Sequence, residues 1–313
     1  MNIVFLDGDS LPSPMPCPPE ATRWTAREKT TLEQVVEALT DADVAITNKV
    51  RIDRSALIHL PRLKLVCVAA TGFDCVDIVT CRDQGVTVCN VPAYSAVSVA
   101  ESVIGSLFAL RRHLLAYRAA SAKYWPTSSQ FCVHGEPIQD LQGSTLGIVG
   151  RGDIGSRVAR LARALEINVL FAEHRDAKQV RAGYTAFDEV LGKADALTLH
   201  CPLTPQTRYL IGSTEIARMK HGALLINTAR GPLVDENAVL AGLASGQLGG
   251  AAMDVLYAEP PRADHPLLHC EHSNLLITPH VAWASQSSVA RLKNTLAANI
   301  TAFAAGAPIN VVN

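Results

Sequence analysis

The chain has 313 residues, with 28 basic and 29 acidic side chains and a formal net charge of −1. This length is more than one small core needs and favours two domains. The balanced charge argues against a protein that binds nucleic acid or an anionic membrane surface. Residues 1–7 have no positively charged n-region, and no apolar run reaches membrane-spanning length, so we expect a soluble, cytoplasmic protein.

The eight cysteines form no C-x-x-C pair and have no zinc-like spacing. We therefore expect reduced, mostly buried thiols. His269, Cys270 and His272 lie close together in the sequence but lack a second matched pair of ligands, so no metal site is predicted.

Strand and helix patterns alternate from the N-terminus onward. After a first strand within residues 1–7, the repeated prolines between Leu11 and Pro19 predict a loop, because proline disfavours both helix and sheet. The apolar run from Leu63 to Ala69 is typical of a strand buried in a parallel sheet. The other elements predicted here are a helix over Thr31 to Leu39 and strands over Val44 to Thr47 and Val86 to Cys89.

A long apolar segment extends from Ser95 to about Ala120 and has the periodicity of one helix. A crossing or interface helix fits this pattern, and so does a helix of an ordinary core. The residues that share its apolar face are Val97, Ala100, Ile104, Leu107 and Leu114.

Residues 145–155 carry the most specific motif, an apolar strand that runs into a G-x-G-x-x-G turn. Gly150 would make the tight turn, Gly152 would let the backbone approach a pyrophosphate, and Gly155 would let the next helix pack on the strand. The start of that helix would offer free N–H groups to the phosphates. A P-loop is excluded, because Ser156 and Arg157 stand where Lys-Ser/Thr should follow. The motif predicts a dinucleotide site.

The context of the motif supports this interpretation. Helical spacing follows the glycines, and Asn168 to Ala172 has the pattern of the next strand. Glu173 then stands where a carboxylate would bind a ribose hydroxyl. Glu173 would repel a 2′-phosphate whereas Arg175 could attract one, so NAD is favoured and NADP stays possible. The apolar positions of the helix are Ile154, Val158, Leu161, Ala162 and Leu165.

The alternation continues to the C-terminal part and predicts an α/β fold of two Rossmann-like, doubly wound parallel-sheet domains. The fingerprint normally marks the first strand of such a unit, yet α/β patterns precede it, so an earlier domain is expected. We predict a substrate-binding domain beginning at 1–94, an NAD(P)-binding domain over 95–282, and a C-terminal helix in 283–313 that returns to the first domain. The remaining predicted strands are 196–200, 223–227, 250–255 and 275–278.

Three polar segments follow three of these strands. Arg230, Glu259 and His280 each stand just beyond a strand, and ligands in open α/β sheets bind at the carboxyl ends of strands. Beside a nicotinamide, such residues suit hydride transfer. The cation would hold a carboxylate and polarise a carbonyl, the histidine would exchange a proton with the C2 oxygen, and the glutamate would stabilise the cationic histidine.

At these motifs, and over nearly its full length, the chain resembles the D-isomer-specific 2-hydroxyacid dehydrogenases. The resemblance implies that Arg230 binds substrate, that Glu259 is the partner carboxylate, and that His280 is the acid/base. It also implies a homodimer that closes two domains around its substrate. A small-molecule 2-keto or 2-hydroxy acid would be the substrate.

The resemblance further implies the residues around cofactor and substrate. The loop at residues 70–77 looks like the family's carboxylate-binding loop, with backbone N–H groups near Gly72 and Phe73; Phe73 is bulkier than that loop's usual residue. Trp283 would wall the substrate pocket. Besides Gly150, Gly152 and Gly155, the implied cofactor contacts are Thr71, Asp153, Ile154, Glu173, Cys201, Pro202, Thr228, Ala229 and Asp254.

Within the family, these motifs are most similar to the glycerate dehydrogenases, also called hydroxypyruvate reductases. We therefore expect NAD(P)-dependent reduction of hydroxypyruvate or glyoxylate. Two alternatives stay open: a dehydrogenase for another 2-hydroxy acid such as 3-phosphoglycerate, and a nucleotide-sensing scaffold of the corepressor type. The absence of a regulatory extension argues against the former, and the absence of long charged tails argues against the latter.

Overall fold

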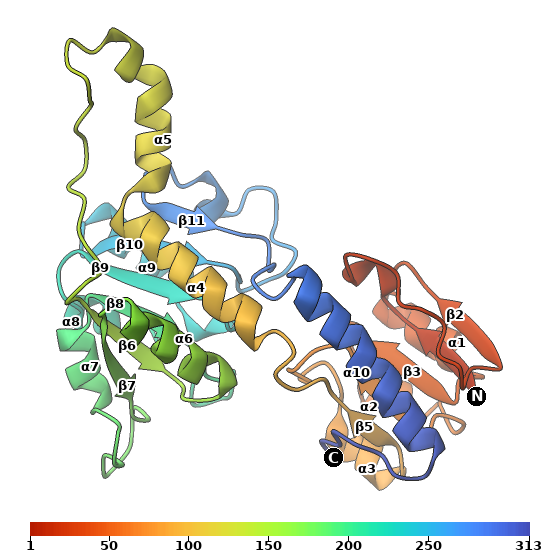
Figure 1. The fold of residues 1–313 in the computed structure, drawn as a ribbon. Coiled ribbons are helices and arrows are strands. Elements are labelled where there is room, and N and C mark those ends of the chain that lie inside the picture. The colour runs from red at the N-terminus through yellow and green to blue at the C-terminus, as the bar shows by residue number, and fades with distance from the viewer. The chain divides into compact units, whose positions relative to one another are not determined.

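The computed structural model describes residues 1–313 and divides into two compact units. Unit 1 consists of Met1–Ser95 together with Ala284–Asn313, and unit 2 of Ala96–Trp283. Each unit has its own parallel sheet with helices on both faces, which confirms the predicted fold class (Figure 1). None of the helices has both the length and the apolar character needed to span a membrane.

Unit 1 is built on a five-stranded sheet with the order β2-β1-β3-β4-β5. All its strands are parallel, and the central strands β3 and β4 are buried over their whole length, as strands covered on both faces must be. The strands are β1 Asn2–Phe5, β2 Arg23–Ala26, β3 Val44–Thr47, β4 Leu65–Val68 and β5 Thr87–Cys89. The helices are α1 Val35–Leu39, α2 Arg54–Leu57, α3 Ile78–Asp83 and α10 Gln286–Ala304, with short 3-10 turns at Gly8–Ser10 and Leu32–Gln34.

The C-terminal segment completes unit 1. Helix α10 buries Leu292, Leu296 and Ile300 completely. Asn299, also buried, donates from Nδ2 to the carbonyl of Asn90 at 2.9 Å. Apolar burial along one helix face and this buried hydrogen bond hold the end of the chain beside its beginning.

Unit 2 is built on a six-stranded parallel sheet with the order β11-β10-β9-β8-β6-β7. Strand β6 lies between β7 and β8. The chain passes from β6 to β7 on one side and then returns to β8 on the other side, which creates a topological switch point at the carboxyl end of β6. The strands are β6 Thr145–Val149, β7 Asn168–Ala172, β8 Ala196–Leu199, β9 Ala223–Asn227, β10 Leu248–Met253 and β11 Leu275–Ile277. The helices are α4 Ala96–Arg111, α5 Leu114–Lys123, α6 Asp153–Ala164, α7 Phe187–Lys193, α8 Ser213–Arg218 and α9 Glu236–Ala244, with 3-10 turns at Trp125–Thr127, Gly231–Leu233 and Pro266–His269.

The prediction of one continuous helix from Ser95 to Ala120 is wrong. Helix α4 ends at Arg111 and α5 begins at Leu114, with His113 in the left-handed region at φ 47° between them. The physical reason is burial: α4 packs in the core of unit 2, whereas α5 buries no residue. With the segment that follows it, α5 forms an arm, residues 114–138, that projects from unit 2 (Figure 1). Strand β2 was not predicted either, because an edge strand that buries none of its residues leaves no apolar run.

Candidate active site

The three glycines of the fingerprint have distinct surroundings at the switch point. Gly150 has φ +100°, and a Cβ there would lie 2.5 Å from the carbonyl oxygen of His200. A Cβ on Gly155 would overlap the carbonyl oxygen of Gly150. A Cβ on Gly152 would meet no atom within 4 Å. Two glycines are therefore required by the packing of the protein itself, and Gly152 leaves open space at the start of α6.

The start of α6 is suited to the phosphates of a dinucleotide. Gly152 is the N-cap of α6, and Asp153 and Ile154 form its first turn, whose N–H groups have no partner within the helix. Such N–H groups and the positive end of the helix dipole bind phosphate. In the loop after β9, Thr228 has a buried Oγ1 without a hydrogen-bond partner, a polar atom that a bound ligand could satisfy.

Glu173 lies directly after β7, beside the fingerprint turn, but its carboxylate is already bound by the protein. Arg181 donates to it twice, from Nε at 2.7 Å and from Nη2 at 2.6 Å. The backbone N–H groups of His174 and Arg181 donate to it at 2.8 and 3.1 Å. The hydrogen bonds from Arg181 hold the pKa of Glu173 at about 2.

The neighbouring residues of the expected nucleotide site lie in loops of unit 2. Arg175 donates to the carbonyl oxygen of Leu210 and forms an ion pair with Glu215 at 3.4 Å, so its guanidinium is engaged within the protein. Cys201 follows β8 and packs against the Gly150 turn, where burial raises the pKa of its thiol to about 11. Pro202 is exposed next to it.

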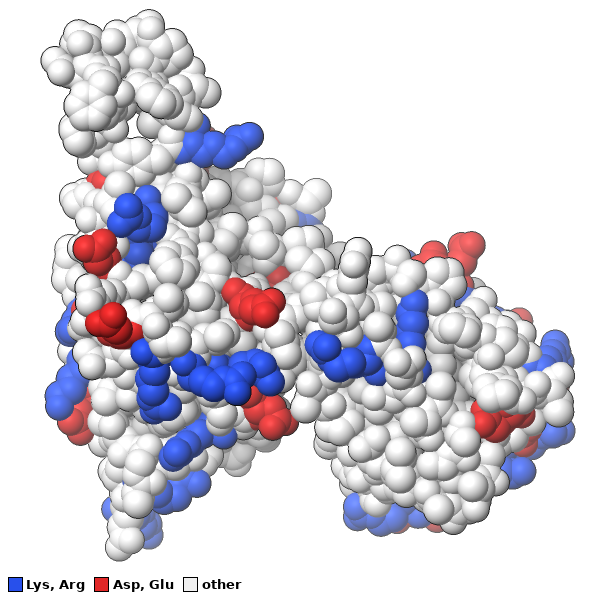
Figure 2. Space-filling view, viewed as in Figure 1, with Lys and Arg blue, Asp and Glu red and all other residues white.

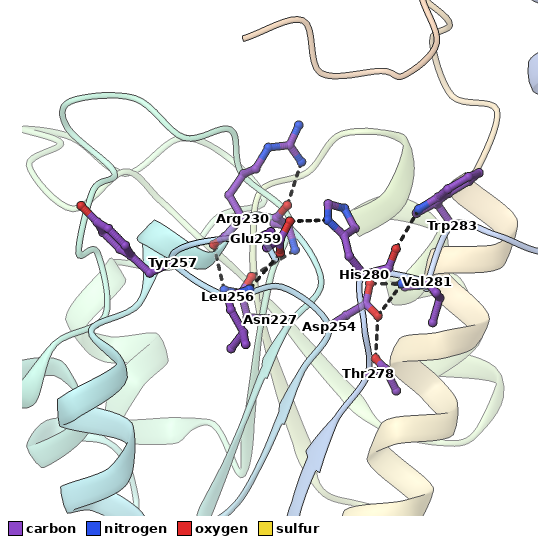
Figure 3. Close-up of polar contacts among 12 residues, drawn as sticks. Asn227, Arg230, Asp254, Leu256, Tyr257, Glu259, Thr278, His280, Val281 and Trp283 are labelled. Atoms are coloured by element: carbon purple, nitrogen blue, oxygen red, sulfur yellow. Dashed lines mark hydrogen bonds and ion pairs between the residues drawn. The ribbon is translucent and has the colours of Figure 1, made fainter. Parts of the chain in front are cut away.

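The three candidate catalytic residues follow three neighbouring strands. Arg230 follows β9, Glu259 follows β10 and His280 follows β11, and these strands are adjacent and parallel in the sheet. Their carboxyl ends therefore lie at one edge, as the sequence predicted. Figure 3 shows this edge of unit 2.

The turn that carries Arg230 is held by Asn227, the fully buried last residue of β9. The Asn227 amide donates to the carbonyl of Arg230 at 2.8 Å and accepts from the N–H of Ala229 at 3.0 Å. A Cβ on Gly231 would overlap the carbonyl oxygen of Leu256, so this turn packs directly on the loop that leads to Glu259. The two loops are thus in direct contact, with no room for a side chain at Gly231.

Glu259 and His280 form a hydrogen-bonded pair, with 2.7 Å between Oε2 and Nδ1 (Figure 3). The other carboxylate oxygen accepts from the N–H of Leu256 at 2.9 Å, which orients the carboxylate. Because the carboxylate accepts from Nδ1–H, the imidazole is held in one tautomer and orientation, with Nε2 turned away from Glu259. His280 keeps one quarter of its side chain exposed, so Nε2 can reach a ligand.

Asp254 holds the segment that carries His280. Its buried carboxylate accepts from Thr278 Oγ1 at 2.5 Å and from the N–H groups of Val281 and Ala282 at 2.9 and 3.0 Å. Burial raises the pKa of Asp254 above its ordinary value, although these hydrogen bonds act to lower it. His280 itself has φ +55°, a strained backbone that the surrounding bonds maintain. Trp283 closes the segment by donating from Nε1 to the carbonyl of His280 at 2.9 Å.

The expected substrate loop lies in unit 1, directly after β4. Thr71 is exposed and donates from Oγ1 to the carbonyl of Val91 at 2.9 Å, while Asn90 donates to the carbonyl of Thr71 at 2.7 Å. The N–H groups of Gly72 and Phe73 donate to no acceptor in the chain. Phe73 packs its ring against the core of unit 1, which accommodates the bulk noted in the sequence.

Sequence reasoning missed three residues that shape the site. Arg181 lies in a loop without periodicity, and nothing local indicates that it binds Glu173. Asn227 and Thr278 end or follow strands in segments that the sequence analysis singled out, and a buried polar residue at a strand end was the available signal. The structure contains no group of three or more His, Cys, Asp or Glu residues placed to hold a metal ion, and all eight cysteines are free thiols.

Comparison with known proteins connects this geometry to one family. Residues 104–282 match the family model described as D-isomer specific 2-hydroxyacid dehydrogenase, NAD binding domain. A Haemophilus influenzae protein, provisionally named a 2-hydroxyacid dehydrogenase, is 48% identical over 308 residues, with 97% of this chain and 98% of the relative covered. The glycerate dehydrogenase of Methylorubrum extorquens is 42% identical over 313 residues, with 99% and 98% covered.

A solved structure has the same fold. The acyclic imino acid reductase Bsp5, in complex with NADPH and D-Arg, superposes with a TM-score of 0.87 at 28% identity, with 100% of both chains covered. The similarity therefore extends over both units and not only over the dinucleotide fingerprint.

Proposed function

The chain belongs to the D-isomer specific 2-hydroxyacid dehydrogenases, which are NAD(P)-dependent oxidoreductases, and from this premise we propose that it reduces hydroxypyruvate or glyoxylate to the corresponding 2-hydroxy acid. The observation that carries the proposal is the 2.7 Å pair of Glu259 and His280. This pair lies in the same unit as the fingerprint turn. The turn follows β6, and the pair follows β10 and β11, the third and fourth strands along the sheet from β6. The glycerate dehydrogenase relative supports hydroxypyruvate as the substrate.

Bound NAD(P)H supplies the hydride that adds to C2 of the keto acid. His280 donates the proton from Nε2 to the carbonyl oxygen, because Nδ1 is occupied by Glu259. Glu259 orients the imidazole and stabilises its cationic form before the proton leaves. Arg230 binds the substrate and polarises the carbonyl through its guanidinium.

The remaining contacts are assigned by the same reasoning. The unpaired N–H groups of Gly72 and Phe73 are suited to a carboxylate, since two neighbouring backbone donors form an anion-binding concavity. Thr228, Ala229 and Asp254 lie at the ends of β9 and β10, where the nicotinamide would be positioned, and Thr71, Cys201 and Pro202 would contact other parts of the cofactor. Trp283 would bound the substrate pocket.

The test is the absorbance of NADH and, separately, NADPH with hydroxypyruvate, glyoxylate, pyruvate and phosphohydroxypyruvate. We expect the fastest oxidation with hydroxypyruvate or glyoxylate. The substrate assignment fails if phosphohydroxypyruvate or pyruvate is reduced faster. The enzymatic assignment fails if the cofactor binds and no 2-keto acid is reduced.

We also propose a homodimer formed through the arm of unit 2. The arm exposes several large apolar side chains, and exposed apolar groups of this density mark a protein interface. They are Leu114, Leu115, Tyr124, Trp125, Phe131 and Ile138, and Phe131 is 89% exposed. Light scattering after size-exclusion chromatography should give twice the chain mass, and Phe131→Asp together with Trp125→Asp should give the single chain mass. A monomeric unmodified protein would contradict this assembly.

A further inference from the structure

The carboxylate of Glu173 has no acceptor capacity left. A carboxylate offers about four lone-pair positions, and Glu173 uses two on each oxygen. Oε1 accepts from His174 N and Arg181 Nη2, and Oε2 accepts from Arg181 N and Nε. The side chain of Glu173 is only 2% exposed. A ribose diol needs a free hydrogen-bond acceptor at this position, and donors from the protein itself already occupy the carboxylate of Glu173.

Arg181 presents the opposite chemistry. Its side chain is 55% exposed, and its Nη1 makes no hydrogen bond in the structure. The guanidinium stacks 4.2 Å from the centroid of the Tyr184 ring, and Arg151 lies over the same ring at 5.5 Å. Glu173 and Tyr184 therefore hold one guanidinium in place, with a second close by, beside the fingerprint turn that ends β6.

The charge of this face is consistent with an anion. Figure 2 shows Lys and Arg side chains gathered over α6 and the loop after β7 in unit 2. Arg175 is not a candidate to bind this anion, because its guanidinium already contacts the carbonyl of Leu210 and the carboxylate of Glu215. A phosphate dianion requires donors and positive charge. Arg181, paired with Glu173 through Nε and Nη2, still has Nη1 as a donor, and Arg151, which also donates to the Gly183 carbonyl at 3.4 Å, adds a second positive charge. A ribose diol requires the acceptor that is missing.

We propose that Arg181 reads the 2′ position of the adenosine ribose and selects the 2′-phosphorylated dinucleotide, with Glu173 as the positioning residue that holds its guanidinium. The inference rests on the proposed function only in requiring that unit 2 bind a dinucleotide. It assigns NADPH as the preferred reductant and reverses the preference for NAD expected from Glu173 in the sequence.

The test uses two ligands that differ only in the 2′-phosphate, adenosine 2′,5′-bisphosphate and 5′-AMP, with dissociation constants measured by calorimetry. We expect the unmodified chain to bind the bisphosphate at least roughly ten-fold more tightly, since a charged hydrogen bond contributes about that factor. Arg181→Gln should remove most of this preference. Arg163→Gln is the matched control, because it removes a charge that lies over Phe171 and does not contact Glu173, and it should keep the preference.

Two results overturn the inference: 5′-AMP binding as tightly as the bisphosphate to the unmodified chain, or an unchanged ratio in Arg181→Gln. If Arg181→Gln does not fold because Glu173 is left buried and unpaired, the double variant Glu173→Gln with Arg181→Gln replaces the pair without charge. That variant must also lose the preference. Binding of the bisphosphate without reduction of any keto acid would refute the proposed function and leave this inference intact, whereas absence of binding by both ligands and by NADPH would refute the inference.

Discussion

Oε2 of Glu259 and Nδ1 of His280 lie 2.7 Å apart, although 21 positions separate the two residues in the chain. The contact forms because β10 and β11 are adjacent and parallel, so the loops that follow them leave the sheet at the same edge. Asp254 then anchors the segment around His280 from below through Val281 and Ala282. His280, the proposed acid/base group, is thus oriented from two sides by contacts within the protein.

Replacing His280 by Asn should lower kcat for keto-acid reduction by roughly 10²–10⁴, because the general acid is lost. Binding of NADPH or NADH, measured by fluorescence titration, should stay within about two-fold, since no contact of the fingerprint turn involves His280. Unchanged turnover would remove His280 from the mechanism.

Replacing Glu259 by Gln should lower kcat by about 10- to 10³-fold, because the amide no longer fixes the charge and tautomer of the imidazole. Glu236→Gln is the matched control. Glu236, the first residue of α9, accepts a 2.8 Å hydrogen bond from the N–H of Tyr257, which lies in the loop that carries Glu259. It does not contact His280. If both variants lost the same activity, loop shape rather than imidazole orientation would be responsible.

Replacing Asp254 by Asn should destabilise the protein by about 1–3 kcal/mol, since one donor amide would face the N–H of Ala282 in a buried position. Urea unfolding measures this difference. Asp264→Asn, on an exposed ion pair with Arg262, should change the unfolding free energy by less than about 1 kcal/mol. Equal effects of the two substitutions would contradict the anchoring role of Asp254.

The fingerprint glycines should separate folding from binding. Gly152→Ala should leave the melting temperature nearly unchanged, because a Cβ there meets no atom within 4 Å, and should weaken dinucleotide binding by roughly ten-fold or more by intruding on the pyrophosphate. Gly155→Ala should destabilise the protein by about 1–3 kcal/mol through overlap with the Gly150 carbonyl. Calorimetric melting and ligand titration of both variants test the pair. A large loss of stability in Gly152→Ala, together with weak binding, would contradict the conclusion that a side chain at this position meets no part of the protein.

The Glu173–Arg181 pair should appear in the acid stability of the protein. Arg181 depresses the pKa of Glu173 to about 2 from an ordinary value of 4.5, so the unfolded chain takes up its proton first. The stabilisation is complete above the ordinary value and is lost as the pH falls from about 4.5 to about 2. Urea midpoints measured across this pH window should fall less steeply for Glu173→Gln than for the unmodified chain. Parallel plots of midpoint against pH for the two proteins would show that the pair does not contribute to stability.

Much of the fold was predictable because it follows from local physics. The strands Asn168–Ala172 and Ala223–Asn227 begin and end where the sequence placed them, since apolar runs and turn residues mark both ends. The break at His113 was not predictable in this way. The apolar face continues past it, and only the folded structure shows that α5 buries none of its residues.

The glycine spacing and the positions of Arg230, Glu259 and His280 after strands were determined by the sequence alone, because a turn or a strand end is specified within a few residues. The pairing of the Glu173 carboxylate was decided by tertiary structure. A carboxylate at the end of β7 looks free in the sequence, and only the folded loop brings Arg181 onto it. Side-chain pairing between segments depends on ångström-scale placement that spacing along the chain does not contain, which is why the sequence located this site and the fold determined how its charges are paired.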